Sequence, residues 1–403
     1  MASASFSVAT PEEELYWLAL RLVPGLGTRR SGQLLERFQS PQSIFRADTR
    51  ELEASGLPGS LARTIASGCT FEDAATQQEL MRKSGTQLLT FNDERYPDRL
   101  RSIFDPPSIL FARGNIDLLG SVCIGVVGTR HPTTYGVAAA ERLGADLARA
   151  GLTIVSGMAR GIDTAAHRAC LSVAGNTIAV LGCGVDVVYP SENRKLAAEI
   201  AMRGLILSEF PMGSTAFPQN FPIRNRIISG VSAGLLVVEG AQYSGSGITA
   251  KLALDQGREV FAVPGNITSK MSWGPNLLIK QGARLVQDWN DVVVELPQVD
   301  QRRLIDAGRQ RILALESAPD GTPNESSAAR PASNQPESQL PEPMAGAARR
   351  ILQQLKPDTT VHLDTLVDSV GDMSPSEIIA ALFELEILGL VRQHPGRNFA
   401  KVW

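Results

Sequence analysis

The spacing of hydrophobic positions changes along the chain, and each change predicts a change of structure. Over residues 12–68, apolar side chains such as Leu15, Leu18 and Leu22 recur at helical intervals, which is typical of short amphipathic helices. From about 114 to 296, short unbroken apolar runs alternate with Gly-rich turns and helical segments. Such runs are typical of strands that are buried on both faces of a parallel sheet.

Seven of these apolar runs are predicted strands. They lie at 122–127, 152–155, 177–182, 205–208, 235–239, 259–263 and 284–286. Because helical segments separate them, the pattern predicts an α/β fold whose core is a Rossmann-like, doubly wound parallel sheet.

The C-terminal quarter of the chain has a different character. Residues 297–345 are rich in Pro, Ser, Ala, Gln and Glu, so we expect a disordered linker. The next segment combines three helical patterns, AARRILQQL, VHLDTLVDSV and SPSEIIAALFELEILGL, with a two-stranded wing around Pro395-Gly396, as in a winged helix. The predicted domains are a helical N-terminal module at 1–90, the Rossmann-like domain at 91–296, the linker at 297–345 and the winged helix at 346–403.

Composition narrows the class of protein. The 403 residues carry a net charge of −3, which excludes a protein that binds polyanions with its whole surface. The apolar runs are much shorter than the roughly 20 residues of a membrane helix, and no secretory signal is visible, so we expect no membrane association. The four cysteines form no CxxC pair. We therefore expect a cytoplasmic protein.

A glycine-containing turn separates the first two predicted helices. It reads Pro24-Gly25-Leu26-Gly27 and resembles the hairpin of a SAM-like or helix-hairpin-helix module, in which backbone N–H groups approach a DNA phosphate. A simple corner between two helices needs the same glycines. Both interpretations are open at this point.

The turns after the first two predicted strands of the sheet carry glycines, hydroxyls and arginines. Such turns meet at the carboxyl edge of an open parallel sheet, where ligands bind. Free N–H groups at the next helix start favour an anion, and a guanidinium can hold two phosphate oxygens. The first turn contributes Gly128, Thr129 and Arg130 as candidate phosphate-binding residues, and the second contributes Ser156, Gly157, Arg160 and Gly161.

Three later segments add candidates for the same edge. The segment FPIRNRIISG supplies Arg224, Asn225 and Arg226, with no carboxylate nearby in sequence to neutralise the two guanidinium groups. After the strand that ends at Glu239, the start of another helix supplies Ser244, Gly245 and Ser246, and Lys195 follows the third strand's turn.

Two other interpretations of these turns are weaker. The first turn has GxxG rather than GxGxxG, and Arg130 stands where a pyrophosphate site needs a small residue, which argues against a dinucleotide. Asp163 and His167 are four residues apart, so a hydrolase with Ser156 as its nucleophile can be drawn. However, Ser156 lacks a GxSxG elbow, and a local stabilising pair of Asp163 and His167 is the simpler interpretation.

The distribution of charge favours a run of phosphates as the ligand. Residues 120–296 contain 15 Lys and Arg against 13 Asp and Glu, so the cationic excess must be concentrated in the strand-end turns. An arginine-lined groove several turns wide is typical of a site for single-stranded nucleic acid. Phe217, Phe221 and Tyr243 are the nearest candidates for base stacking, although we expect each to pack in the core.

The last predicted helix does not favour insertion into a DNA groove. It carries Glu377, Glu384 and Glu386 and no Lys or Arg, and residues 346–403 contain 6 basic against 7 acidic residues. Phosphates would repel it, so we expect the winged helix to contact protein.

Together, several blocks resemble the DNA-processing protein A (DprA/Smf) family. They are GTRHPTTYG, SGMARGIDTAAH, AVLGCGVDVVYPSENRKL, SEFPMG, FPIRNRIISG, VVEGAQYSGSGITA and REVFAVPGN, and they cover nearly all of 90–296 in order. The resemblance implies a non-enzymatic recombination mediator that protects incoming single-stranded DNA and loads the RecA recombinase during natural transformation. It implies a homodimer through the Rossmann-like domain, with Arg130 and the later basic residues in a phosphate-contacting pocket. It implies neither a cofactor nor a metal ion.

Two alternative functions are open. A nucleotide phosphoribohydrolase-like enzyme could use the same fold, although the turn SGSGIT stands where such an enzyme has PGGxGT. The chain could also be an adaptor whose winged helix docks a protein and whose DNA binding is incidental.

Overall fold

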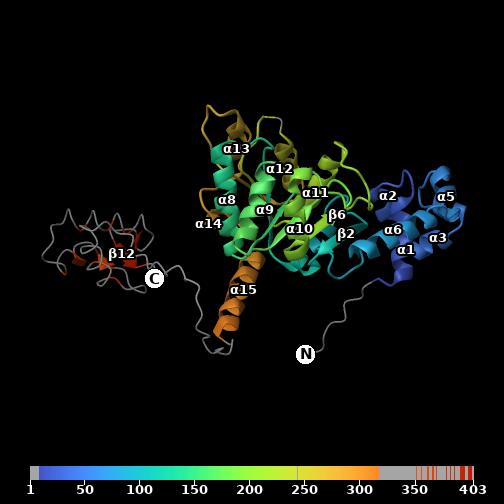
Figure 1. Cartoon of the computed structure of the whole chain (residues 1–403), viewed down its shortest axis with the longest axis horizontal. Helices are drawn as coiled ribbons and strands as arrows, with labels where there is room; N and C mark the ends of the chain where they lie inside the picture. Colours follow the sequence, from blue (N-terminus) through green and yellow to red (C-terminus); the bar gives the residue numbers. More distant parts are fainter. Residues whose placement is uncertain are drawn as a thin grey trace. The chain divides into compact units, whose positions relative to one another are not determined.

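A computed structural model describes residues 9–242 and 244–316, together with isolated positions between 351 and 401. The chain divides into two compact units, Met1–Ala318 and Pro319–Trp403 (Figure 1). The first unit holds the N-terminal helices and the large sheet.

Six helices form the N-terminal part of the first unit. They are α1 (Pro11–Leu22), α2 (Thr28–Phe38), α3 (Pro41–Arg46), α4 (Thr49–Glu53), α5 (Gly59–Ala66) and α6 (Phe71–Ser84). A capping box fixes the start of α1, where the Thr10 side chain accepts from the Glu13 N–H and the Glu13 carboxylate accepts from the Thr10 N–H. The apolar stripes bury Leu18, Leu20 and Leu34 completely or nearly so. These helices lie within residues 1–90, where a helical module was predicted, and the last residues of that range form a strand of the sheet.

A nine-stranded sheet forms the centre of the first unit. Its strands are β1 (Gln87–Thr90), β2 (Ile109–Gly114), β3 (Cys123–Val127), β4 (Thr153–Ser156), β5 (Thr177–Val180), β6 (Leu205–Ser208), β7 (Gly234–Val237), β8 (Glu259–Ala262) and β9 (Arg284–Leu285). Their order is β1-β2-β6-β5-β4-β3-β7-β8-β9, and the seven strands from β3 to β9 are parallel. All seven predicted strands and the doubly wound parallel sheet are confirmed.

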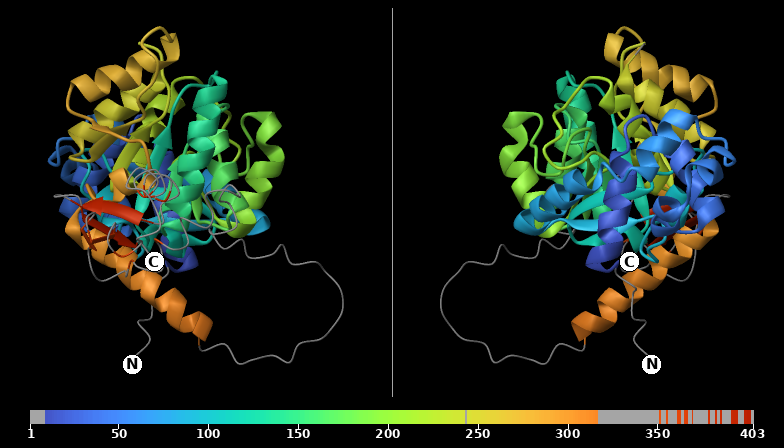
Figure 2. Two further views of the ribbon diagram at one scale, coloured as in Figure 1. Left: turned by 90° about the vertical axis from the view of Figure 1, so that its left-hand side faces the viewer. Right: turned by 90° about the vertical axis from the view of Figure 1, so that its right-hand side faces the viewer.

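Helices cover both faces of this sheet (Figure 2). They are α7 (Asp98–Arg101), α8 (Thr134–Arg149), α9 (Ile162–Ser172), α10 (Arg194–Arg203), α11 (Asn220–Val231), α12 (Gly245–Asp255), α13 (Trp273–Lys280) and α14 (Trp289–Val293). Successive side chains of β3 pack on opposite faces of the sheet. Ile124 and Val126 pack in the core that includes α8 and α9 residues, whereas Cys123 and Val127 pack in the core that includes α11 and α12 residues.

The chain reverses its winding direction at β3. This strand pairs with β4 on one side and with β7 on the other, so the chain proceeds outward from β3 in both directions. The crevice at the carboxyl end of such a switch point is where open α/β sheets bind ligands.

The predictions for one edge of the sheet and for the start of the linker need correction. Strands β1 and β2 were not predicted; β2 pairs antiparallel with β1 and β6 and extends the parallel sheet. Residues 298–316, expected to begin a disordered linker, form helix α15 (Gln298–Glu316). Asp300 in its first turn is buried and forms an ion pair with Arg99 of α7, which ties this helix to the sheet domain.

The second unit contains a small antiparallel sheet. Strands β11 (Val391–His394) and β12 (Asn398–Lys401) pair antiparallel and flank Pro395-Gly396, so the predicted wing is confirmed. Strand β10 (Val361–His362) pairs with β12, which corrects the prediction that Val361 and His362 begin a helix. Most residues of the three predicted helices lie outside the described positions.

No helix among the described residues is both long enough and apolar enough to cross a bilayer.

Candidate nucleic-acid interface

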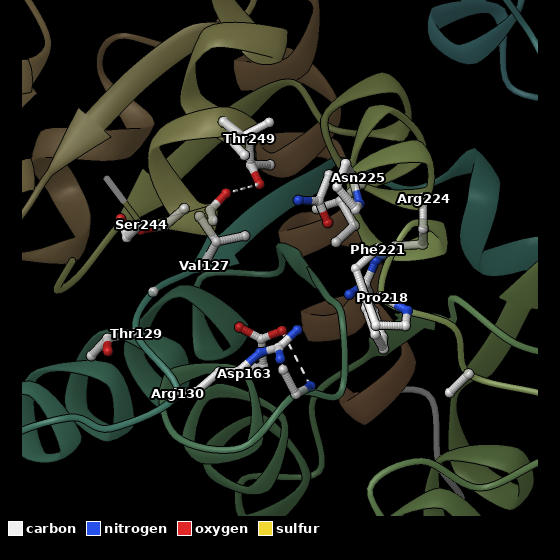
Figure 3. Close-up of a pocket in the computed structure, with 18 of the residues that line it drawn as sticks. Val127, Thr129, Arg130, Asp163, Pro218, Phe221, Arg224, Asn225, Ser244 and Thr249 are labelled. Atoms are coloured by element: carbon white, nitrogen blue, oxygen red, sulfur yellow. Dashed lines mark hydrogen bonds between the residues drawn. The ribbon is translucent and has the colours of Figure 1, made fainter. Parts of the chain in front are cut away.

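A pocket of about 520 Å³ opens at the carboxyl ends of β3, β4 and β7, at the switch point of the sheet. Figure 3 shows Arg130 and Asp163 entering it from one side, and Phe221 and Arg224 of α11 from the other. The loop before α12 closes a third side with Ser244. The pocket thus joins turns that are far apart in the sequence.

Arg224 is a buried cation in the wall of this pocket. Its side chain is almost inaccessible, and its Nη1 donates to the carbonyl oxygen of Val180 at the end of β5. Burial lowers the pKa of Arg224 to about 10, and the nearby Asp163 carboxylate opposes this shift. The guanidinium group therefore remains charged at neutral pH, held in a fixed position by the backbone.

Asp163 supports the turn that follows β4. Its Oδ2 accepts hydrogen bonds from the N–H groups of Gly157 and Ala159, at 3.1 and 3.3 Å. Burial raises the pKa of the Asp163 carboxyl, although the charge of Arg224 and these N–H groups act in the opposite direction. A Cβ atom at Gly157 would collide with the guanidinium group of Arg224, so this position requires glycine.

Arg130 and an aromatic pair form the accessible part of the pocket. The Arg130 guanidinium lies 5.0 Å from the centroid of the Phe221 ring, and that of Arg224 lies 5.9 Å from it. Tyr189 packs at a tilt against Phe221, with 5.5 Å between ring centroids. Phe221 therefore lines the pocket, which corrects the expectation that it packs in the core.

Of the other two candidates for base stacking, the structure describes only Phe217. Phe217 is 53% exposed, so it does not pack in the core either. Tyr243 lies outside the described residues.

The turn that carries Arg130 is fixed by a buried carboxylate. Glu239, 1% exposed at the end of β7, accepts hydrogen bonds from the N–H and the hydroxyl of Thr133, and its carbonyl oxygen accepts from the Thr129 N–H. Gly128 has no room for a side chain, because a Cβ atom there would lie 2.5 Å from Cγ1 of Ile162. Glu239 is not among the site residues predicted from the sequence, although it ends the predicted strand at 235–239.

Most of the predicted site residues meet at this edge. Gly128, Thr129, Arg130, Arg224, Asn225, Ser244, Gly245 and Ser246 line the pocket, and Gly157 and Arg160 line an adjoining hollow that shares Arg130 and Phe221 with it. Arg160 forms an exposed ion pair with Glu192, 2.6 Å from Nε to Oε1. Arg130 has no carboxylate partner within the described part of the chain.

Four predicted residues line neither hollow: Ser156, Gly161, Lys195 and Arg226. The hydroxyl of Ser156 is buried and donates to the Val126 carbonyl oxygen at 2.6 Å. Gly161 has a positive φ of 79° and packs against the backbone of Thr129, so its function is to shape the turn. Lys195 is exposed on α10 and does not line either hollow.

Arg226 is the clearest correction to the predicted site. Its side chain is 6% exposed; Nη2 lies 2.5 Å from Glu209, and Nε lies 3.1 Å from Asp105. The acidic partners that sequence proximity did not reveal come from the end of β6 and from the loop before β2. Arg226 is therefore a neutralised, structural arginine and does not face the pocket.

The hydrolase arrangement is also absent. His167 is buried, and its Nδ1 lies 2.7 Å from the Thr177 hydroxyl rather than bonding to Asp163, so the expected local pair does not form either. The Ser156 hydroxyl donates to the Val126 carbonyl oxygen and not to His167. Ser156, His167 and Asp163 therefore do not form a catalytic triad. Within the described residues, no group of three or more His, Cys, Asp or Glu side chains could hold a metal ion.

The fold and the pocket together define an α/β protein with an arginine-lined pocket at its switch point. Residues 87–297 match the family model of DNA recombination-mediator protein A, and residues 335–397 match that of the DprA winged helix domain. The chain belongs to this DprA/Smf family of DNA-processing proteins, which confirms the resemblance found in the sequence.

One relative extends the match over nearly the whole chain, and others match a part of it. Protein Smf of Synechocystis is 36% identical over 96% of this chain and 99% of its own length. DNA processing protein DprA of Bacillus subtilis is 45% identical over 54% of this chain and 73% of its own length. The X-ray structure of DNA processing protein A from Streptococcus pneumoniae has a TM-score of 0.59 at 35% identity, covering 72% of this chain and 99% of that one.

Proposed function

We propose that the pocket binds single-stranded DNA and does not cleave it. The observation that carries this proposal is the placement of Arg130 and Arg224 on the ring of Phe221, in a pocket that the start of α12 also lines. Guanidinium groups and free N–H groups bind phosphates, and an accessible aromatic pair stacks a base of any sequence. The family's description as a recombination mediator supports a DNA ligand.

The proposal extends to the partners of the bound strand. We propose that the protein protects incoming single-stranded DNA, loads RecA onto it during natural transformation, and acts in the cytoplasm as a homodimer formed through the Rossmann-like domain. RecA filaments should then assemble faster on a strand that carries this protein than on the same strand coated with a single-strand-binding protein. Equal assembly rates in a fluorescence assay would contradict the loading function.

Replacing Arg130 should weaken binding to all sequences to a similar extent. We expect Arg130→Ala to lower the affinity for a labelled oligo-dT about tenfold, because one exposed guanidinium group that contacts phosphate is lost. The slope of log affinity against log salt should become shallower by about 0.7, the value for one phosphate contact on a single strand. Fluorescence anisotropy titrations at several salt concentrations measure both quantities.

Arg149→Ala is the matched control for this test. Arg149 is another exposed arginine, but it lies at the C-terminal end of α8, on the opposite edge of the sheet from the pocket. We expect wild-type affinity and salt dependence from this control. An Arg130→Ala variant that behaves like the control would remove the pocket as the DNA site.

A further inference from the structure

A second hollow lies on the same edge of the sheet as the pocket. Strand β2 runs antiparallel to β6, so the residues before Ile109 lie beside the carboxyl end of β6. Strand β1 pairs antiparallel with β2, with Thr90 opposite Ile109, so its last residues reach the same edge. Helix α2 of the N-terminal module covers this corner and encloses a groove of about 620 Å³.

The groove contains an exposed aromatic ring beside an arginine. Phe104 is 80% exposed, and the guanidinium group of Arg29 lies 5.3 Å from its ring centroid. On the other wall, Arg101 lies 5.3 Å from the ring centroid of Phe91. Glu36 is the one carboxylate among the residues that line the groove, so the two arginines leave it cationic.

This combination is suited to a nucleotide. A phenyl ring that projects into water gains free energy when a base stacks on it, and an adjacent guanidinium group can contact the flanking phosphate or extend the stack. The amide side chains of Gln33 and Asn92 in the same groove supply polar contacts for a base edge. The groove therefore presents the same chemistry as the pocket, on different elements.

Two carboxylates, Glu209 and Asp105, lie on the edge between the two hollows, and Arg226 offsets part of their negative charge. Glu209 at the end of β6 and Asp105 before β2 would repel a phosphate chain if they were unpaired. Arg226 contacts both carboxylates, and Asp105 is the more exposed of the two, at 38%. This gives the second arginine of FPIRNRIISG a role along the path of the strand although it does not touch the pocket.

We propose that a single DNA strand that occupies the pocket continues along this edge into the groove of α2, where a base stacks on Phe104 and a phosphate meets Arg29. The inference rests on the function proposed for the pocket. Four strand spacings of about 4.8 Å separate β3 from β2, which is about 19 Å. At a stacked rise of 3.4 Å per nucleotide this distance is about six nucleotides, within the length that one single-strand-binding fold engages.

The test compares a short and a long oligomer on the full chain. A labelled (dT)4 spans about 10 Å at this rise and can fill only one hollow, whereas (dT)20 can reach both. We expect Phe104→Ala and Arg29→Ala each to weaken binding of (dT)20 about tenfold, because one stacked base or one phosphate contact is lost, and to leave the Arg130-dependent binding of (dT)4 unchanged. Phe104→Tyr, which keeps the ring, should retain wild-type affinity for (dT)20, as should Arg149→Ala.

Photocrosslinking locates the strand directly. An oligo-dT with 4-thiothymidine near one end should crosslink to a peptide that contains Phe104 when its length is 20, and not when its length is four. If Phe104→Ala binds (dT)20 like wild type and no such crosslink forms, the groove is not a DNA site even though Arg130→Ala still weakens binding. If Arg130→Ala has no effect on either oligomer, the proposed function of the pocket fails as well.

Discussion

We expect Glu209→Gln to lower the free energy of unfolding by about 3 kcal/mol, because it leaves a buried guanidinium group without its closest counter-charge. Glu209 is 2% exposed, and its Oε2 lies 2.5 Å from Nη2 of Arg226, which is itself 5% exposed. Burial raises the pKa of Glu209, while Arg226 and Arg21 of α1 act in the opposite direction. Arg226 keeps its positive charge in this variant, because a guanidinium group stays protonated in proteins.

Urea denaturation of the full chain measures this effect. Glu199→Gln is the matched control, because Glu199 forms an ion pair of similar length with Arg203, but both side chains are 42% exposed. Such exposed pairs contribute about 0.5 kcal/mol or less, so the control should unfold near the wild-type midpoint. The double variant Glu209→Leu with Arg226→Met should recover most of the lost stability, since it removes both charges. A Glu209→Gln variant that unfolds with the control would contradict a structural role for this pair.

The sheet could be predicted because its strands are buried on both faces. Runs such as LILS at 205–208 have no polar alternation, and β6 has these same bounds. Strands β1 and β2 were missed because antiparallel strands beside a helical module have no flanking βα repeat to mark them. Helix α15 was missed because its sequence is strongly polar, and its first turn is tied to the domain by a distant contact between Asp300 and Arg99.

The sequence predicted only those features of the site that depend on residues close to one another in the chain. Turns at strand ends identified Arg130 and Arg224, because topology brings those turns to one edge. The roles of Arg224 and Arg226 could not be separated, since residues two apart on a helix point in directions about 200° apart and either one can face a pocket. The deciding partner of Arg226, Asp105, is 121 positions away, and no pattern in the sequence connects them.

The largest pH effect should come from His167, which lies one turn after Asp163 on α9. Burial lowers the pKa of His167 to about 3, and the charge of Arg224 adds to the shift. The Thr177 hydroxyl donates to the Ile154 carbonyl oxygen, so it accepts a hydrogen bond from Nδ1–H of His167. The other nitrogen, Nε2, is buried without a hydrogen-bond partner, so a proton added there would bring an unpaired charge into the core.

The direction of the pH effect follows from the different pKa values of His167 in the unfolded and the folded protein. An unfolded histidine takes up a proton below about pH 6.5, whereas the folded one resists it down to about 3, so stability is fully present above about 6.5 and falls as the pH drops towards 3. Each pH unit in that window removes about 1.4 kcal/mol, which is about 2 kcal/mol at pH 5. Urea unfolding at pH 7.5 and 5.0 measures this loss of unfolding free energy. The His167→Gln variant should not show the loss, whereas His131→Gln, at an exposed position, should show it as the wild type does. The ordinary pKa values of Asp and Glu, about 3.9 and 4.3, lie below the compared range of pH 5.0 to 7.5. A His167→Gln variant with the wild-type pH dependence over this range would therefore show that the folded protein accommodates the imidazolium form.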